Sequence, residues 1–116
     1  MFSNVSNLFS TMGYVNASWT LRSELASEFI CRVLNKMETL SANEVVPTLD
    51  LSNQLKAENF FGENFSPGYI MRDFNLFPKQ ADIDTWRFIH NYKVDRKSVL
   101  SRPLEDGVLK FKTIQR

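Results

Sequence analysis

The sequence predicts an α+β domain in which N-terminal helices pack on a four-stranded antiparallel meander sheet. Apolar residues repeat at helical spacing through residues 18–40, and after residue 69 they alternate with polar residues in short runs. The second half also carries turn signals between these runs, as expected for strands joined by short connections. A length of 116 residues suits one domain, so we expect residues 1–116 to form a single unit.

The long amphipathic helix, about residues 18–40, has the clearest pattern. At about 100° per residue its apolar side chains fall on one stripe, with Glu24, Glu28 and Glu38 on the opposite side. Asn16 or Ser18 is suited to cap the first turn. The stripe consists of Trp19, Ala26, Phe29, Ile30, Val33, Leu34, Met37 and Leu40. It is long enough to cover one face of a small sheet.

The segments on either side of this helix are less regular. Residues 1–15 are rich in Ser and Asn, which predicts a loose arm or a short helix. Residues 41–50 are expected to be a connector, because Pro47 lacks the N–H group that a helix or a strand ladder uses. A second, short helix should then run from Asp50 or Ser52 to about Phe60.

The predicted sheet has strands at about 69–77, 85–94, 98–104 and 108–114. Residues 85–94 alternate between two faces, and Pro103 favours the end of a strand. Asp106-Gly107 is a typical hairpin turn before the last strand. In that strand Leu109 and Phe111 should face inward, with Lys110 and Lys112 facing outward.

This element order is similar to helix-on-curved-sheet folds of the cystatin-like and NTF2-like kind. The resemblance covers about residues 18–114 and concerns the predicted topology, with no diagnostic motif. It therefore implies an outline for the fold and nothing about an activity.

Several classes of function are disfavoured by the residues present. The four glycines form no phosphate-binding loop, and one His and one Cys leave no spacing for a structural metal, so we expect no metal and no cofactor. No secretory signal and no long apolar run occur, which predicts a cytoplasmic protein without a membrane contact.

The alternating strand nevertheless offers one weak catalytic candidate, His90. With Trp86, Phe88, Tyr92 and Phe111 on the same face, His90 could supply the polar group of an apolar pocket that binds or processes a small molecule. The competing interpretation is a histidine at the edge of the core, with an ordinary hydrogen bond to backbone.

A basic face is the second candidate site. If the strand phases hold, Arg87, Lys93, Lys110 and Lys112 point outward together and would suit an acidic protein or a phosphate backbone. The charge supports this only mildly, since residues 61–116 carry ten Lys and Arg against seven Asp and Glu. Outward lysines also simply keep a sheet soluble, and no aromatic platform for bases shares the face.

The leading functional hypothesis rests on the expectation that some apolar side chains remain exposed on the folded domain. Ten phenylalanines exceed what so small a domain readily buries, and the helix is long for it. We therefore expect a small non-catalytic protein-binding domain, an adaptor, inhibitor or assembly module, with a protein partner or a homodimer. The alternatives are the His90 pocket and nucleic-acid binding through the basic face.

Overall fold

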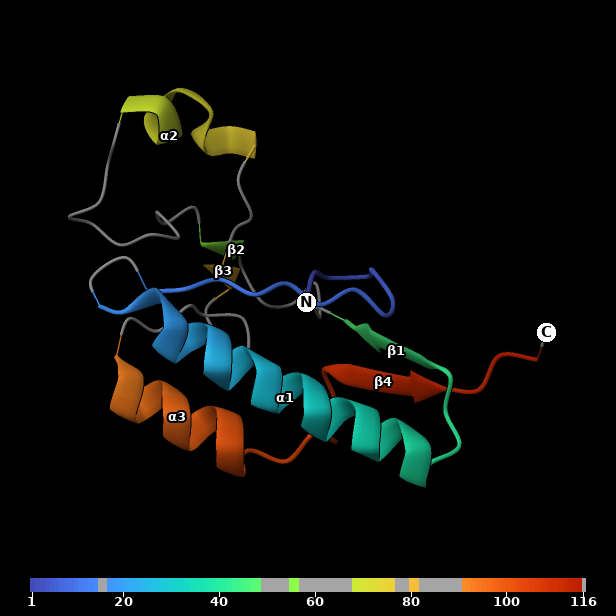
Figure 1. Ribbon diagram of the computed structural model, residues 1–116. Coiled ribbons are helices and arrows are strands. Elements are labelled where there is room, and N and C mark those ends of the chain that lie inside the picture. The colour runs from blue at the N-terminus through green and yellow to red at the C-terminus, as the bar shows by residue number, and fades with distance from the viewer. Residues whose placement is uncertain (15–16, 49–54, 57–67, 77–79, 82–90, 116) are drawn as a thin grey trace.

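The computed structural model describes residues 1–14, 17–48, 55–56, 68–76, 80–81 and 91–115. Its helices are α1 (Trp19–Thr39), α2 (Gly68–Arg72), the 3₁₀ turn η1 (Phe74–Leu76) and α3 (Tyr92–Ser101). Its strands are β1 (Glu44–Pro47), β2 (Leu55–Lys56), β3 (Gln80–Ala81) and β4 (Leu109–Lys112). Figure 1 shows α1 and α3 packed side by side, with α2 and η1 at the opposite end of the molecule.

The predicted four-stranded meander is wrong. The described strands form two separate antiparallel pairs, β1 with β4 and β2 with β3. The expected strand 69–77 is replaced by α2 and η1, and the expected strand 98–104 begins inside α3. Residues 92–94 of the expected strand 85–94 are also helical, while its first six residues lie outside the described part. Because that outline requires the four-stranded sheet, the cystatin-like and NTF2-like prediction is wrong as well.

Helix α1 does match its prediction, within one residue at each end. Its inward face lies slightly to one side of the expected stripe: Leu25, Ala26 and Val33 are buried, whereas Trp19 and Leu34 stay about half exposed. Ser18 occupies the cap position, but its side chain makes no capping hydrogen bond to the helix backbone. The helix therefore depends on packing along its length more than on its first turn.

Strand β4 also falls where the alternation predicts, but its partner differs. It pairs with β1, where Val45 lies opposite Phe111 and Pro47 opposite Leu109. Leu109 and Phe111 are half-buried and Lys110 and Lys112 exposed, as expected from the phase. Gly107, at φ 84°, makes the turn before β4, and Asp106 Oδ1 accepts a hydrogen bond from the Val108 N–H.

Pro47 is tolerated in β1 because its nitrogen faces away from β4. The carbonyls of Val45 and Pro47 accept hydrogen bonds from the N–H groups of Asn7 and Asn4, at 2.9 and 2.8 Å, on the opposite edge. In an antiparallel pair alternate residues turn their hydrogen-bonding groups to opposite sides. The missing N–H of Pro47 thus removes no bond to β4, and the N-terminal segment covers this free edge of the strand.

Asn7 holds the N-terminal segment to β1, and its loss should be measurable. Its Oδ1 accepts from the Val45 N–H at 2.9 Å and its Nδ2 donates to the Asn43 carbonyl at 3.0 Å. Its φ of 57° is also one that asparagine tolerates better than alanine. We expect Asn7→Ala to lower the free energy of unfolding by about 2 kcal/mol in urea titrations. Asn7→Asp keeps the acceptor and should cost clearly less; equal losses would contradict this account.

Candidate functional site between helices α1 and α3

A buried carboxylate joins three segments of the chain. Asp95 on α3 is the buried charged residue of the described part, 5% exposed. Its Oδ2 accepts a hydrogen bond from the Tyr14 hydroxyl at 2.5 Å and lies 2.8 Å from Nε of Arg22 on α1. Burial of a carboxylate is favourable only with such partners. The Tyr14–Asp95–Arg22 cluster therefore fixes the N-terminal segment against both helices.

The electrostatics of this cluster keep Tyr14 protonated. Burial raises the pKa of Tyr14 far above its ordinary value, and the hydrogen bond to the Asp95 carboxylate raises it further. A phenol in this state donates a proton in a hydrogen bond but is neither a base nor a nucleophile at neutral pH. The arrangement thus positions groups and does not by itself supply acid–base chemistry.

This raised pKa predicts a loss of stability in alkali. Above pH 10.0, the ordinary pKa of the side chain, the unfolded chain releases the Tyr14 proton while the folded chain retains it. The free energy of unfolding should then fall with pH, with a slope approaching about 1.4 kcal/mol per pH unit from this group. Urea unfolding from about pH 8 to about pH 11.5 measures the slope. Tyr14→Phe should be less stable at pH 8 and have a flatter profile; an unchanged slope would contradict the assignment.

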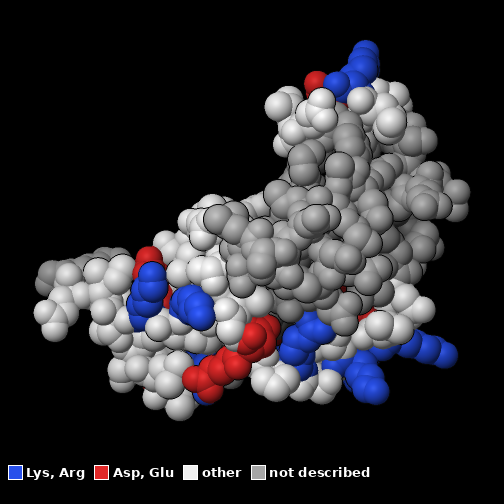
Figure 2. All heavy atoms as spheres, turned by 180° about the vertical axis from the view of Figure 1, so that it is seen from behind, with Lys and Arg blue, Asp and Glu red and all other residues white. Residues whose placement is uncertain are grey.

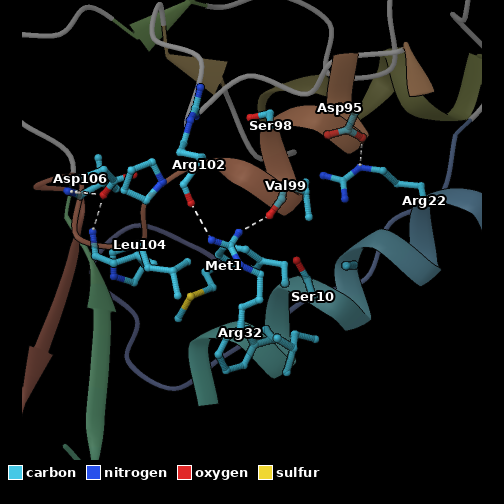
Figure 3. Close-up of a pocket in the computed structure, with 18 residues that line it drawn as sticks. Met1, Ser10, Arg22, Arg32, Asp95, Ser98, Val99, Arg102, Leu104 and Asp106 are labelled. Atoms are coloured by element: carbon cyan, nitrogen blue, oxygen red, sulfur yellow. Dashed lines mark hydrogen bonds and ion pairs between the residues drawn. The ribbon is translucent and has the colours of Figure 1, made fainter. Parts of the chain in front are cut away.

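A second arginine of α1, Arg32, binds the C-terminal end of α3. Arg32 donates through Nη1 to the carbonyl of Val99 and through Nη2 to that of Arg102, the latter at 2.7 Å. These carbonyls lie at the C-terminus of α3, where the helix dipole favours a cation. One turn further along α1, Nζ of Lys36 lies 3.1 Å from Oε2 of the largely exposed Glu105. Arg22 and Arg32 of α1 thus hold α3 toward its two ends, as Figure 3 shows, and Lys36 pairs with the segment that follows α3.

A cavity of about 210 Å³ lies between these contacts. Figure 3 shows Arg22 and Asp95 at one side of it, Arg32 near its centre and Leu104 and Asp106 at the other side. Apolar side chains make up much of the wall, namely Phe9, Ala26, Phe29, Ile30, Val99, Leu104, Val108 and Leu109. The volume is below the range of about 300–1,000 Å³ usual for drug-sized ligands and cofactors. The cavity therefore has room only for a small chemical group.

Most of the residues predicted to line a pocket lie outside this site. Trp86, Phe88 and His90 fall outside the described residues, as does Arg87 of the basic face. Tyr92 begins α3 and Phe111 lies in β4; neither lines the cavity described above. The role suggested for His90 thus stays a prediction.

The cations expected on one sheet face lie on two kinds of element. Lys93 is in α3, whereas Lys110 and Lys112 are in β4. Lys112 Nζ lies 3.9 Å from Oε2 of Glu44, its cross-strand neighbour. On the face drawn in Figure 2, acidic and basic side chains lie close together along the lower edge. Within the described residues, no group of three or more His, Cys, Asp or Glu is placed to hold a metal ion.

Sequence reasoning missed the residues that organise this site: Tyr14, Arg22, Arg32 and Asp95. The available signal was the helical spacing of Asp95, Ser98, Val99 and Arg102, all of which line the cavity from α3 or its C-cap. Hydrophobic periodicity does not reveal this helix face, because its buried residue, Asp95, carries a carboxylate and not an apolar side chain. Asn91 gave a further hint, since its side chain caps α3 by accepting from the Val94 N–H at 3.3 Å.

The chain is similar to flavin enzymes over nearly its whole length. It is 40% identical over 111 residues to a probable FAD-binding monooxygenase, AlmA, of Acinetobacter baylyi. It is 37% identical over 114 residues to the FAD-containing monooxygenase EthA of Mycobacterium tuberculosis, and 33% identical over 111 residues to the putative FAD-containing monooxygenase MymA of the same species. Each match covers 96% of this chain. No family model and no solved structure matches it.

These matches correct the functional expectation. A small non-catalytic protein-binding domain does not fit a chain whose relatives are named as monooxygenases, and that expectation is wrong. The two alternatives, a small-molecule pocket protein or enzyme using His90 and nucleic-acid binding through the basic face, depend partly on residues outside the described part and stay predictions. None of the helices within the described ranges is long and apolar enough to cross a membrane. The chain spans about 22% of the length of these relatives, so its similarity is to one portion of a monooxygenase.

Proposed function

We propose that this chain forms one portion of an FAD-dependent monooxygenase whose flavin is held mainly by polypeptide outside these residues. The observation that carries the proposal is 40% identity to an FAD-binding monooxygenase across 96% of the chain, which spans 22% of that relative. The exposed and unpaired Cys31 is consistent with a reducing compartment such as the cytoplasm.

The residues present do not fit a complete FAD site. A dinucleotide is a large ligand, and the cavity between α1 and α3 measures only about 210 Å³. The chain also lacks the Gly-rich turn between a strand and a helix that receives a pyrophosphate. We therefore assign this chain no step of the flavin chemistry. Its contribution under this proposal is a rigid pair of helices, α1 and α3, locked by Asp95 and Arg32.

A segment exchange tests the proposal. The 111-residue matching segment of the Acinetobacter baylyi relative would be replaced by the corresponding residues of this chain. We expect the purified chimera to retain FAD through gel filtration, measured by its visible absorbance, and to catalyse the oxygenation that the unmodified relative catalyses. A Gly/Ser linker of equal length in the same place is the control and should lose the oxygenation activity. A chimera that is folded by circular dichroism but holds no FAD would reject the proposal.

A further inference from the structure

Arg32 brings a positive charge to the cavity between α1 and α3. Its side chain is part-buried and lies near the centre of the cavity in Figure 3. Two of its five N–H groups donate to carbonyl oxygens, those of Val99 and Arg102. Carbonyl groups carry no net charge, and the C-terminus of a helix offsets only about half a unit charge. Within the described residues no Asp or Glu pairs with Arg32, so part of its charge has no counter-charge.

The carboxylates in the wall of the cavity have donors of their own. Asp95 Oδ2 lies 2.8 Å from Arg22 Nε at one side. At the other side Asp106 Oδ1 accepts a hydrogen bond from the Val108 N–H at 2.9 Å. Arg32 is thus a cation of this cavity that an anionic ligand can still neutralise.

The remaining wall and the volume limit what such a ligand can be. The side chains of Phe29, Ile30, Leu104 and Val108 supply apolar surface around the cation. The cavity measures about 210 Å³, and at about 30 Å³ for each water-sized group it has room for on the order of seven non-hydrogen atoms. The ligand must therefore be short, with one charged end and an apolar remainder.

We propose that this cavity binds a small monocarboxylate with a short alkyl chain, its carboxylate on Arg32 and its chain against the apolar wall. A guanidinium matches a carboxylate in geometry and charge, and the bond between them is charge-assisted. A phosphate dianion fits less well, because a single arginine would leave one of its charges unpaired in a largely apolar cavity. The site is formed by this chain's own residues, and it goes beyond the proposed function because it does not depend on where the flavin is held.

Pentanoate is the probe that tests this site. The full 116-residue chain, labelled with ¹⁵N, would be titrated with sodium pentanoate, pentanamide or sodium acetate at constant ionic strength and followed by NMR. Pentanamide keeps the length of pentanoate without its charge, and acetate keeps the charge without the chain. We expect pentanoate to shift the signals of Arg32 Nε–H and the Val99 amide, and to bind about tenfold more tightly than either control.

Three variants assign the binding to the cavity. In Arg32→Met the cation is absent, so pentanoate should lose its advantage over pentanamide. In Ala26→Leu a larger side chain enters the cavity from a wall position that is 8% exposed, so both ligands should bind more weakly. Lys36→Met removes a cation of the same helix that does not line the cavity, and its affinities should equal those of the unmodified chain.

The possible results either support the site or overturn it. Equal affinities for pentanoate and pentanamide, or for pentanoate and acetate, would overturn it, as would shifts confined to residues away from the cavity or no shifts at all. Because Arg32 also holds the C-terminus of α3, Arg32→Met could fail to give the spectrum of a folded protein. Ala26→Leu then decides: weaker binding of pentanoate supports the site, and unchanged binding by this folded variant overturns it.

Discussion

Replacing Asp95 with alanine is expected to lower the free energy of unfolding by about 3 kcal/mol, the largest effect of any single substitution considered for this chain. The carboxylate is 5% exposed and lies between the Tyr14 hydroxyl and Arg22 Nε. Its removal breaks the ion pair with Arg22 and the hydrogen bond from the Tyr14 hydroxyl, both at a buried carboxylate. Urea denaturation followed by far-ultraviolet circular dichroism measures the loss.

Two variants show that the effect belongs to the buried charge. Asp95→Asn keeps an oxygen that can accept from Tyr14 but removes the charge, so its loss should lie between those of alanine and wild type. Asp73→Ala, at an exposed position beside η1, should change the unfolding free energy by no more than about 0.5 kcal/mol. A loss below 1 kcal/mol for Asp95→Ala would show that the cluster does not hold the helices together.

Replacing Arg32 with methionine is expected to cost about 2–3 kcal/mol, because two charge-assisted hydrogen bonds to the C-terminus of α3 disappear while the apolar stem remains. In Arg32→Lys a single ammonium group replaces the two guanidinium nitrogens that donate to the two carbonyls. This variant should therefore recover only part of the lost free energy of unfolding. Circular dichroism of the native state should also show less helix for the methionine variant.

Lys36→Met is the matched control on the same helix. Lys36 pairs with Glu105, whose side chain is 63% exposed, and such pairs contribute about 0–1 kcal/mol. If Arg32→Met were no more harmful than Lys36→Met, or if Arg32→Lys restored full stability, the two carbonyl contacts would not explain how α3 is held.

Helix α1 and strand β4 were predictable because each carries its own local pattern. In α1 an apolar stripe runs through more than five turns, and a pattern of that length has no strand alternative. In β4 the sequence Leu-Lys-Phe-Lys alternates after an Asp-Gly turn. In each element, polar side chains lie on the side that faces solvent and apolar side chains on the side that packs inward. This contrast can be read from the sequence without knowing which element packs against it.

Strand β1 and helix α3 were missed for opposite reasons. Pro47 argues against a strand, yet the register with β4 directs its nitrogen to the other edge, where no N–H is required. The buried position of α3 is held by Asp95, so hydrophobic periodicity does not mark its inward face. The alternation through residues 85–94 then favoured a strand that, over residues 92–94, the capped helix replaces.

The candidate site illustrates the same limit. Tyr14 and Asp95 are 81 residues apart, and Arg32 lies 67 residues before Val99, whose carbonyl it contacts. Composition and spacing describe neighbours along the chain, so they singled out His90 and the lysines, while the long-range partners of Asp95 left no local trace. Local residue patterns fix α1, β4 and the turn at Gly107, because the hydrophobic effect and backbone sterics act within a few residues. Tertiary packing alone decides which strand β4 pairs with, that residues 92–101 are helical, and that a carboxylate is buried between two helices, since each depends on partners supplied from distant parts of the chain.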